Sequence, residues 1–229
     1  MKIAIDGPAG AGKSSVAEGV ARILQIPHFD TGATYRAAAC VLLRRNVDLN
    51  DAKTVIRMCR QMHIDIQFRP DGQHTRVDSE DLTAYLRTEE VGNAASRIAK
   101  YAEVRALMVD QQQTTAGLFR DILIDGRDIG TSVMPDADVK IFLTASAEER
   151  AGRRLSEMQR SGITADYESV LAAIKKRDEQ DMNREADPLC CPKDAVVVDT
   201  TEMTFDESVR KILDLIRRRS SEAGETTES

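Results

Sequence analysis

The sequence predicts an α/β protein whose parallel sheet is covered by helices on both faces. Short apolar, β-prone runs alternate along the chain with longer segments of helical periodicity, which is the order that builds parallel sheets. Each run is almost continuously apolar, as a strand buried on both faces requires. A glycine-rich loop separates the first run from the first helical segment. The 229 residues suffice for one domain with small inserted lobes.

The predicted strands cover residues 3–6, 26–29, 122–125, 139–143 and 196–199. The predicted helices cover residues 15–25, 34–45, 51–62, 88–99, 103–115, 147–160, 167–183 and 205–218. Residues 64–87 break this order, because two runs that alternate with period two flank a Pro-Asp-Gly turn. They predict a small antiparallel insertion. Its position after a candidate substrate helix favours a lobe that covers substrate over a surface hairpin without a role.

The glycine-rich loop fits the pattern G-x-x-x-x-G-K-[ST] between a strand and a helix, which makes a chance glycine turn a poor alternative. It reads Gly7-Pro8-Ala9-Gly10-Ala11-Gly12-Lys13-Ser14, with Ser15 following. Glycines let successive N–H groups turn toward one anion, and the helix N-terminus adds its positive dipole end. Lys13 can reach the β- and γ-phosphates, and the Ser14 hydroxyl can hold Mg²⁺. The loop therefore predicts binding of a nucleoside triphosphate.

Composition limits the partners of the protein. Hydrophobic residues make up 41% and charged residues 31% of the chain, which predicts a packed core and a polar surface. The net charge of −6 and the pI of about 5.3 are the opposite of what a nucleic-acid-binding surface needs. No apolar run approaches the ~20 residues of a membrane span. The first strand begins at Lys2 without a signal-peptide pattern, so we expect a cytoplasmic protein.

The cysteines and histidines predict no metal centre. Cys40 and Cys59 fall among apolar neighbours on helical segments and are expected in the core. Cys190 and Cys191 lack C-x-x-C spacing and have no histidine nearby, so a zinc site is disfavoured and reduced thiols are expected. His28 lies in a short strand and is interpreted as packed or solvated rather than catalytic.

Three further segments favour an anionic small acceptor. Residues 30–36 end a strand and begin a helix, with Arg36 in its first turn. Residues 125–130 read Asp-Gly-Arg-Asp-Ile-Gly directly after an apolar strand, where ligands of open α/β sheets bind. Arg177, Asp181 and Arg184 are spaced so that they share one helix face. Singly, each segment could be only a turn or a solvated face.

The helix at residues 147–160 carries three close arginines and ends near Gly162. Ion pairs such as Glu149–Arg153 would explain a solvated helix. The phosphate loop elsewhere in the chain favours the alternative, a mobile lid whose arginines close over phosphates. Residues 220–229 lack apolar periodicity and are expected to be disordered.

Taken together, these segments resemble the bacterial cytidylate kinases, which are nucleoside monophosphate kinases of the phosphate-loop class. The resembling segments are IDGPAGAGKSS (5–15), DTGATYR (30–36), RTEEVGNAAS (87–96), DGRDIGT (125–131), KIFLTASAEERAGRR (140–154) and KKRDEQDMNREADPL (175–189). The phosphate loop alone would indicate only the superfamily of P-loop NTPases. The segment DGRDIGT and the RDxxDxNR pattern at 177–184 are much more specific.

The resemblance implies the reaction ATP + (d)CMP → ADP + (d)CDP with Mg²⁺. It also implies a five-stranded parallel core, an NMP-binding lobe and a short lid, which together form one kinase domain. The implied boundaries are the domain at 1–219, its core at 1–33, 100–146 and 164–219, the lobe at about 34–99 with the insertion 64–87, the lid at about 147–163 and the tail at 220–229. A monomer is expected from the same resemblance.

The resemblance also implies roles for single residues. Those expected to bind CMP are Arg36 and Arg127 at the monophosphate with Arg184 nearby, Thr31, Ser96, Arg105 and Asp128 at the cytosine, and Arg177 and Asp181 at the ribose. Those expected to bind ATP are residues 7–15 and Arg153. Those expected to act in catalysis are Lys13, Arg127, Arg150 and Arg154. Thr31 departs mildly from the family, which often has serine there.

Elementary chemistry supports the cytosine assignment. The N4 amino group of cytosine donates where uracil presents the O4 acceptor, so a carboxylate such as Asp128 favours CMP over UMP. Rival interpretations are a kinase for UMP, AMP or a metabolite hydroxyl, and a nucleotide-dependent switch without catalysis. The [NT]-K-x-D segment of guanine-reading GTPases is absent from the sequence.

Overall fold

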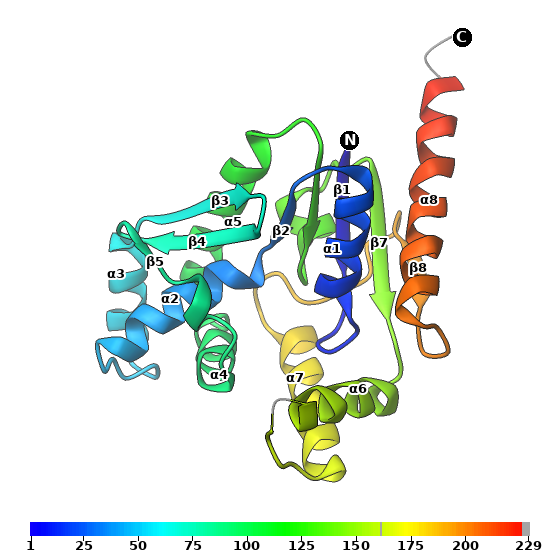
Figure 1. Cartoon of the computed structure of the whole chain (residues 1–229). Coiled ribbons are helices and arrows are strands. Elements are labelled where there is room, and N and C mark those ends of the chain that lie inside the picture. The colour runs from blue at the N-terminus through cyan, green and yellow to red at the C-terminus, as the bar shows by residue number, and fades with distance from the viewer. Residues whose placement is uncertain (161, 226–229) are drawn as a thin grey trace.

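A computed structural model describes residues 1–160 and 162–225 and confirms the predicted fold class (Figure 1). Its main sheet has five parallel strands in the order β2-β6-β1-β7-β8. These strands are β1 (Lys2–Asp6), β2 (His28–Asp30), β6 (Ile122–Asp125), β7 (Val139–Thr144) and β8 (Val196–Asp199). The strand β1 therefore lies at the centre, and the phosphate loop leaves the sheet from the middle of its carboxyl edge.

Helices cover both faces of this sheet. On one face α1 (Lys13–Leu24) and α8 (Phe205–Glu225) pack together. The opposite face is covered by α5 (Ala102–Gly117). Successive side chains of a strand point to opposite faces. Ile3 and Ile5 accordingly join the core with α1 and α8, whereas Ala4 joins the core on the α5 side.

A second lobe has its own core beside the sheet (Figure 1). Its helices are α2 (Gly32–Arg44), α3 (Ala52–Gln61) and α4 (Glu89–Ile98). Its strands are β3 (Ile64–Arg69), β4 (Gly72–Val77) and β5 (Glu80–Asp81), followed by a short 3₁₀ turn at Thr83–Tyr85. The three strands pair antiparallel, as the alternating pattern of residues 64–87 predicts. The Gln73 side chain accepts a hydrogen bond from the Asp30 amide at 2.8 Å and so joins the insertion to the end of β2.

The helices α6 (Ala147–Arg160) and α7 (Tyr167–Asn183) pack against each other beyond the carboxyl end of β7 (Figure 1). Only a small buried cluster, Ala151, Val170 and Ile174, forms the centre of this contact. The two helices therefore share a smaller apolar core than the helices that cover the sheet.

The observed elements differ from the predicted ones at a few ends. The strand β2 begins at His28 rather than at residue 26, because the Ile26 amide closes helix α1 onto the Ala21 carbonyl and Pro27 has no N–H. Helix α1 begins at Lys13, directly after the left-handed Gly12. The prediction also missed a π-helical turn, η2 (Ile129–Val133), which depends on a distant side chain described below.

The end of α8 is a further correction. The helix continues to Glu225, whereas composition predicted disorder from residue 220. No proline interrupts residues 220–223, and the first glycine of the segment comes only at 224, so nothing local stops the helix earlier. Residues 226–229 of the predicted tail lie outside the described residues.

Candidate active site

The phosphate loop is folded as its glycines require. Gly7 has φ +148°, and a Cβ there would lie 1.9 Å from the Leu143 carbonyl oxygen, so only glycine fits. Gly12 is left-handed and precedes the first turn of α1. The Lys13 side chain lies within the loop, where its ammonium donates to the Pro8 carbonyl at 2.8 Å. Burial, followed by the nearby Arg127 charge, lowers the pKa of Lys13 to about 7. An arriving phosphate would supply the missing counter-charge.

The metal side of this loop involves a residue that sequence reasoning missed. The Ser14 hydroxyl donates to Asp125 Oδ2 at 2.8 Å. Asp125 ends β6 next to the loop, and an acidic residue at the end of a buried apolar strand was the available signal. The two side chains offer oxygen ligands, which suit Mg²⁺, and this ion commonly takes only one or two protein ligands beside phosphate and water. Among the described residues, no group of three or more acidic, His or Cys side chains could hold a metal.

His28 holds the Asp125 carboxylate of this Ser14–Asp125 pair in place. Its Nε2 lies 2.7 Å from Asp125 Oδ1, so both oxygens of that carboxylate are hydrogen-bonded. Burial alone would lower the pKa of His28, but the hydrogen bond and charge of Asp125 raise this pKa overall. The residue is packed, as expected, although it packs onto the site itself.

Several arginines converge beside the phosphate loop. Arg36 pairs with Asp30 at 2.6 Å, and Arg127 pairs with Asp181 at 2.9 Å. Arg177 makes no hydrogen bond or ion pair within the described part of the chain. Burial lowers its pKa, and the charges of three neighbouring guanidinium groups lower it further. Those neighbours are Arg127, Arg36 and Arg154. This concentration of positive charge is suited to an anion.

Three guanidinium nitrogens near this point are buried without a hydrogen-bond partner among the described residues. They are Arg36 Nε, Arg177 Nε and Arg184 Nη2. Buried donors are normally satisfied, and a guanidinium fork matches phosphate oxygens in shape and charge. All three arginines belong to the set that the sequence assigned to CMP.

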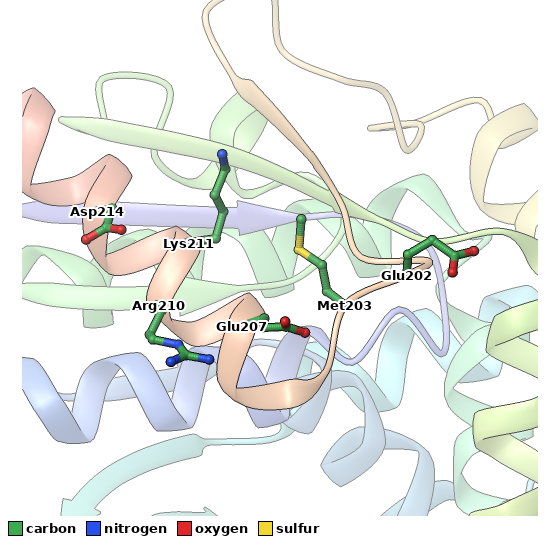
Figure 2. Close-up of a pocket in the computed structure, with 6 residues that line it drawn as sticks. All are labelled: Glu202, Met203, Glu207, Arg210, Lys211 and Asp214. Carbon is green, nitrogen blue, oxygen red and sulfur yellow. The ribbon is translucent and has the colours of Figure 1, made fainter.

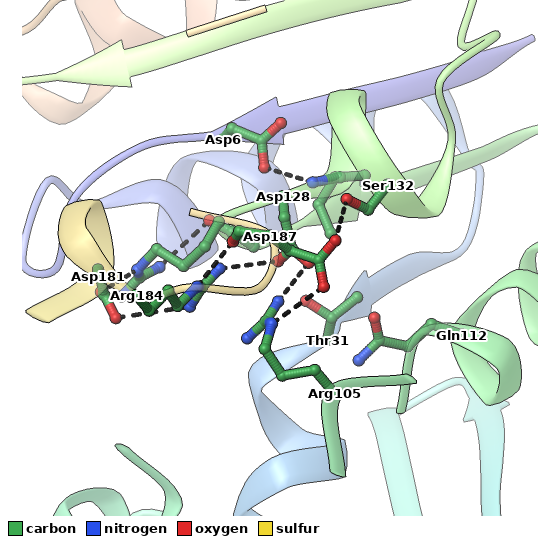
Figure 3. A network of polar contacts seen from close by, with 12 residues as sticks. Asp6, Thr31, Arg105, Gln112, Asp128, Ser132, Asp181, Arg184 and Asp187 are labelled. Carbon is green, nitrogen blue, oxygen red and sulfur yellow. Dashed lines mark hydrogen bonds and ion pairs between the residues drawn. The ribbon is translucent and has the colours of Figure 1, made fainter. Parts of the chain in front are cut away.

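The predicted cytosine end is a buried acidic and basic network (Figure 3). Asp128 is 6% exposed and accepts from Arg105 Nη2 at 2.5 Å, while its other oxygen lies 3.5 Å from Arg184 Nη2. Burial raises the pKa of Asp128, and the charges of these two arginines oppose that rise. Thr31 donates to the Asp125 carbonyl at 2.8 Å and so lies beside this network.

Tyr35 contacts the same network, although no specific sequence pattern marked it. The Arg105 guanidinium lies 5.5 Å from the centre of its ring, within the range of a cation–π contact. Its hydroxyl is buried and has no partner among the described residues. Only its place directly before Arg36 in the predicted binding segment could have indicated it.

Asp6 explains the π-helical turn and was likewise missed. Its carboxylate accepts from the Ile129 and Gly130 amides, each at 2.7 Å (Figure 3). Asp6 is 1% exposed and directly precedes Gly7, so one side chain joins the phosphate loop to the turn that carries Asp128. An acidic residue at the end of an otherwise apolar strand was the only sequence signal.

The predicted lid arginines take three different positions. Arg150 is buried and donates to the Ala9 carbonyl at 2.9 Å, while it pairs with Asp178 at 2.7 Å. Arg153 donates to the Thr200 carbonyl at 2.6 Å. Arg154 pairs with Glu157 at 2.8 Å and is partly exposed. In this arrangement Arg150 fastens α6 to the phosphate loop, so a direct phosphate contact would require its bonds to be exchanged.

Two features stand apart from this cluster. Ser96 is half-buried on α4, and its side chain makes no hydrogen bond within the described residues. A hollow of about 420 Å³ lies along the start of α8 (Figure 2). It is lined by Glu202, Met203, Glu207, Arg210, Lys211 and Asp214. None of these is a predicted site residue, and we assign the hollow no ligand.

Comparison with known proteins identifies the family. The sequence model of the family described as cytidylate kinase matches residues 3–218. The chain belongs to the cytidylate kinase family. It is 42% identical over 220 residues to a cytidylate kinase of Caldanaerobacter subterraneus subsp. tengcongensis, with 96% of each chain covered. It is 43% identical over 221 residues to a cytidylate kinase of Mycolicibacterium paratuberculosis, with 96% of this chain and 97% of that protein covered.

Solved structures with low sequence identity support the fold alone. A gluconokinase from Sinorhizobium meliloti superposes with a TM-score of 0.50 at 15% identity, covering 98% of this chain and 96% of that one. An uncharacterized protein from Eubacterium ventriosum gives a TM-score of 0.52 at 14% identity, with 95% and 98% covered. Within the described residues, no helix is long and apolar enough to cross a membrane.

Membership of the cytidylate kinase family gives the observed cluster its interpretation. The residues that lie together or are joined by the contacts above are Lys13, Ser14, Thr31, Arg36, Arg105, Arg127, Asp128, Arg154, Arg177, Asp181 and Arg184. Ser96 and Arg153 are not joined to this cluster by any hydrogen bond within residues 1–160 and 162–225. The roles assigned to all of these residues, inside the cluster and outside it, stay predictions.

Proposed function

We propose that this protein transfers the γ-phosphoryl group of ATP to CMP and dCMP, in the presence of Mg²⁺. The observation that carries the proposal is the set of buried guanidinium nitrogens next to the phosphate loop that make no hydrogen bond among the described residues. They are Arg36 Nε, Arg177 Nε and Arg184 Nη2, of which the last has only a 3.5 Å ion pair with Asp128. A nucleoside monophosphate supplies the acceptors that these donors lack. Membership of the cytidylate kinase family supports cytosine as its base.

At the ATP site the protein needs only to bind the phosphates and to balance their charge. Lys13 and the loop amides hold the phosphates. Ser14 and Asp125 would offer the oxygen ligands for Mg²⁺, whose charge would balance that of the phosphates when it is bound. The attacking oxygen of a monophosphate is already ionised at pH 7, so no general base is required. The arginines then position the acceptor in line and stabilise the developing charge.

The acceptor side determines which base is taken. Asp128 is buried, so water cannot separate its carboxylate from the bound base. A base that presents an acceptor instead of a donor would therefore face the carboxylate directly. Cytosine donates through N4, whereas uracil presents O4. A site built to accept a hydrogen bond from its substrate can reject an analogue that cannot donate it by roughly 10⁴-fold, and here O4 of uracil would also be repelled by the carboxylate. This account favours CMP over UMP as the acceptor, with Arg177 and Asp181 at the ribose.

Acceptor-dependent turnover tests the proposal. Purified protein with Mg²⁺ and ATP is supplied with CMP, dCMP, UMP or AMP in separate reactions, and release of ADP and formation of the diphosphate are both measured. We expect turnover with CMP and dCMP only. Turnover with UMP or AMP alone would make the protein a different monophosphate kinase. ATP binding without acceptor-dependent turnover would favour the nucleotide switch.

We further propose that the protein acts as a monomer in the cytoplasm. The family resemblance supports the first statement, and the reduced, unpaired thiols support the second, since all four cysteines are free. Sedimentation of the purified protein tests the first: a single species near 25.3 kDa is expected, and a stable dimer would contradict it.

A further inference from the structure

The loop after α7 places an acidic residue, Asp187, against the cytosine end of the site. Asp187 has φ +44°, a left-handed conformation that non-glycine residues adopt uncommonly and that often marks functional sites. Its carboxylate reaches two elements. Oδ2 accepts from Arg105 Nε at 3.1 Å, and Oδ1 accepts from the Ser132 hydroxyl in η2 at 2.7 Å.

The backbone of the same residue holds a second arginine. The Asp187 carbonyl accepts from Arg184 Nε at 2.7 Å. Asp187 therefore contacts both arginines that flank Asp128, one through its side chain and one through its carbonyl (Figure 3). Because Arg105 Nε donates to Asp187, the guanidinium plane is oriented so that Nη2 can donate to Asp128.

Charge balance points the same way. Arg105 is only 1% exposed and Arg184 is largely buried, so Asp128 alone would leave these three side chains with a net positive charge. Asp181 lies 3.7 Å from Arg184 Nη1, but its charge is already paired with Arg127 at 2.9 Å. Buried charges are stable only when paired. Asp187 supplies the second negative charge. Although burial opposes this ionisation, the Ser132 hydrogen bond and the Arg105 charge keep the pKa of Asp187 below its usual value.

We propose that Asp187 is a positioning residue for cytosine recognition: it fixes Arg105 and Arg184 so that the Asp128 carboxylate faces the base. This inference rests on the proposed function. Asp187 acts through the two arginines. Its replacement should therefore weaken binding of the monophosphate acceptor and leave binding of ATP unchanged.

The unusual backbone conformation allows matched variants. Asparagine and glycine both tolerate φ > 0, so Asp187→Asn removes the charge and Asp187→Gly removes the side chain without new backbone strain. Both keep the carbonyl that receives Arg184. Glu185→Gln is the control, because Glu185 is exposed on the same loop and its substitution removes one negative charge there, as Asp187→Asn does. Ser132→Ala releases Asp187 from η2 without altering the acid.

The experiment measures KM for CMP and for ATP, the ratio of kcat/KM for CMP to that for UMP, and the dissociation constant of CMP by calorimetry without ATP. For Asp187→Asn and Asp187→Gly, KM and the dissociation constant for CMP are expected to rise on the order of tenfold, since a charge-assisted hydrogen bond is lost. KM for ATP stays within about twofold, the CMP preference falls, and Glu185→Gln matches the wild type.

Several results overturn the inference. An unchanged KM for CMP in both Asp187 variants does so, and so does an equal rise of KM for ATP, which would indicate general damage to the site. If the Asp187 variants do not fold, Ser132→Ala decides: about a threefold rise in the CMP dissociation constant supports the inference, and no rise overturns it. If the wild type neither binds nor phosphorylates CMP, the proposed function falls and the inference falls with it. Wild-type turnover with unaffected variants overturns the inference alone.

Discussion

At the scale of single residues, Asp6 connects the two halves of the site. Its carboxylate holds the Ile129 and Gly130 amides, and it directly precedes the phosphate loop. Burial raises the pKa of Asp6 to about 6, although both backbone hydrogen bonds oppose that rise. The folded protein therefore keeps this carboxyl protonated at pH values where the unfolded chain has already lost the proton.

This shift predicts a pH dependence of stability. A carboxyl whose folded pKa is raised stabilises the protein fully below pH 3.8, and this contribution is lost as pH rises through about 6. Between pH 4 and pH 7, the free energy of unfolding of wild type minus that of Asp6→Asn should fall by about 2 kcal/mol. Denaturant unfolding of both proteins across this range measures it. A difference that is constant or rises with pH would contradict the assignment.

Lys13 gives the second prediction at this scale. Its ammonium is enclosed by the phosphate loop and has no carboxylate hydrogen-bonded to it among the described residues. Replacing it should lower turnover by orders of magnitude, because it stabilises charge on the β- and γ-phosphates. Steady-state rates of Lys13→Ala, compared with Lys53→Ala on the exposed face of α3, measure this effect. A folded Lys13→Ala protein with near-normal turnover would refute the mechanism.

At the scale of elements, regular segments were more predictable than the turns between them. The strands β6 and β8 and the helices α6 and α7 begin and end where periodicity places them, because these segments depend mainly on local pattern. The turn η2 was not predictable, since its conformation depends on the Asp6 carboxylate more than a hundred residues away. The end of α8 was missed because polar composition alone does not stop a helix.

The helix α6 gives a prediction for the lid assigned to residues 147–163. It packs on α7 through a small buried cluster and reaches the phosphate loop through Arg150. Segments with few buried apolar contacts open at low free energy. Amide hydrogen exchange in this segment should therefore slow when ATP and CMP bind together, while exchange in the buried turns of α8 stays the same. Unchanged exchange at α6 would rule out closure over the nucleotides.

At the scale of the whole molecule, the sequence predicted which segments meet but not how they are held. The motifs at 7–14 and 125–130 come together because the parallel strands β1 and β6 end at one edge of the sheet. The motif at 177–184 lies at the end of α7 and is joined to them by the Arg127–Asp181 ion pair. Asp125 and Asp187, which hold these residues in place, lie in segments that the sequence singled out, but nothing in those segments assigned them these contacts. Their partners lie far away in sequence, so only the folded chain reveals them.

The site draws its residues from three parts of the fold. The donor loop belongs to the sheet, whereas Arg36 belongs to the helical lobe and Arg154 to α6. The positive charges of Arg36 and Arg154 both lie near Arg177 and lower its pKa. Binding of two anionic nucleotides at that point would relieve the repulsion among these arginines and draw the three parts together.

Direct competition between two acceptors tests the central claim that the site reads cytosine through Asp128. Equimolar CMP and UMP are incubated with limiting ATP and Mg²⁺, and CDP and UDP are separated and measured, so that early product amounts give the ratio of kcat/KM. CDP should exceed UDP by several orders of magnitude with the wild type, and the excess should be smaller with Asp128→Ala. Comparable amounts of CDP and UDP from the wild type would contradict it.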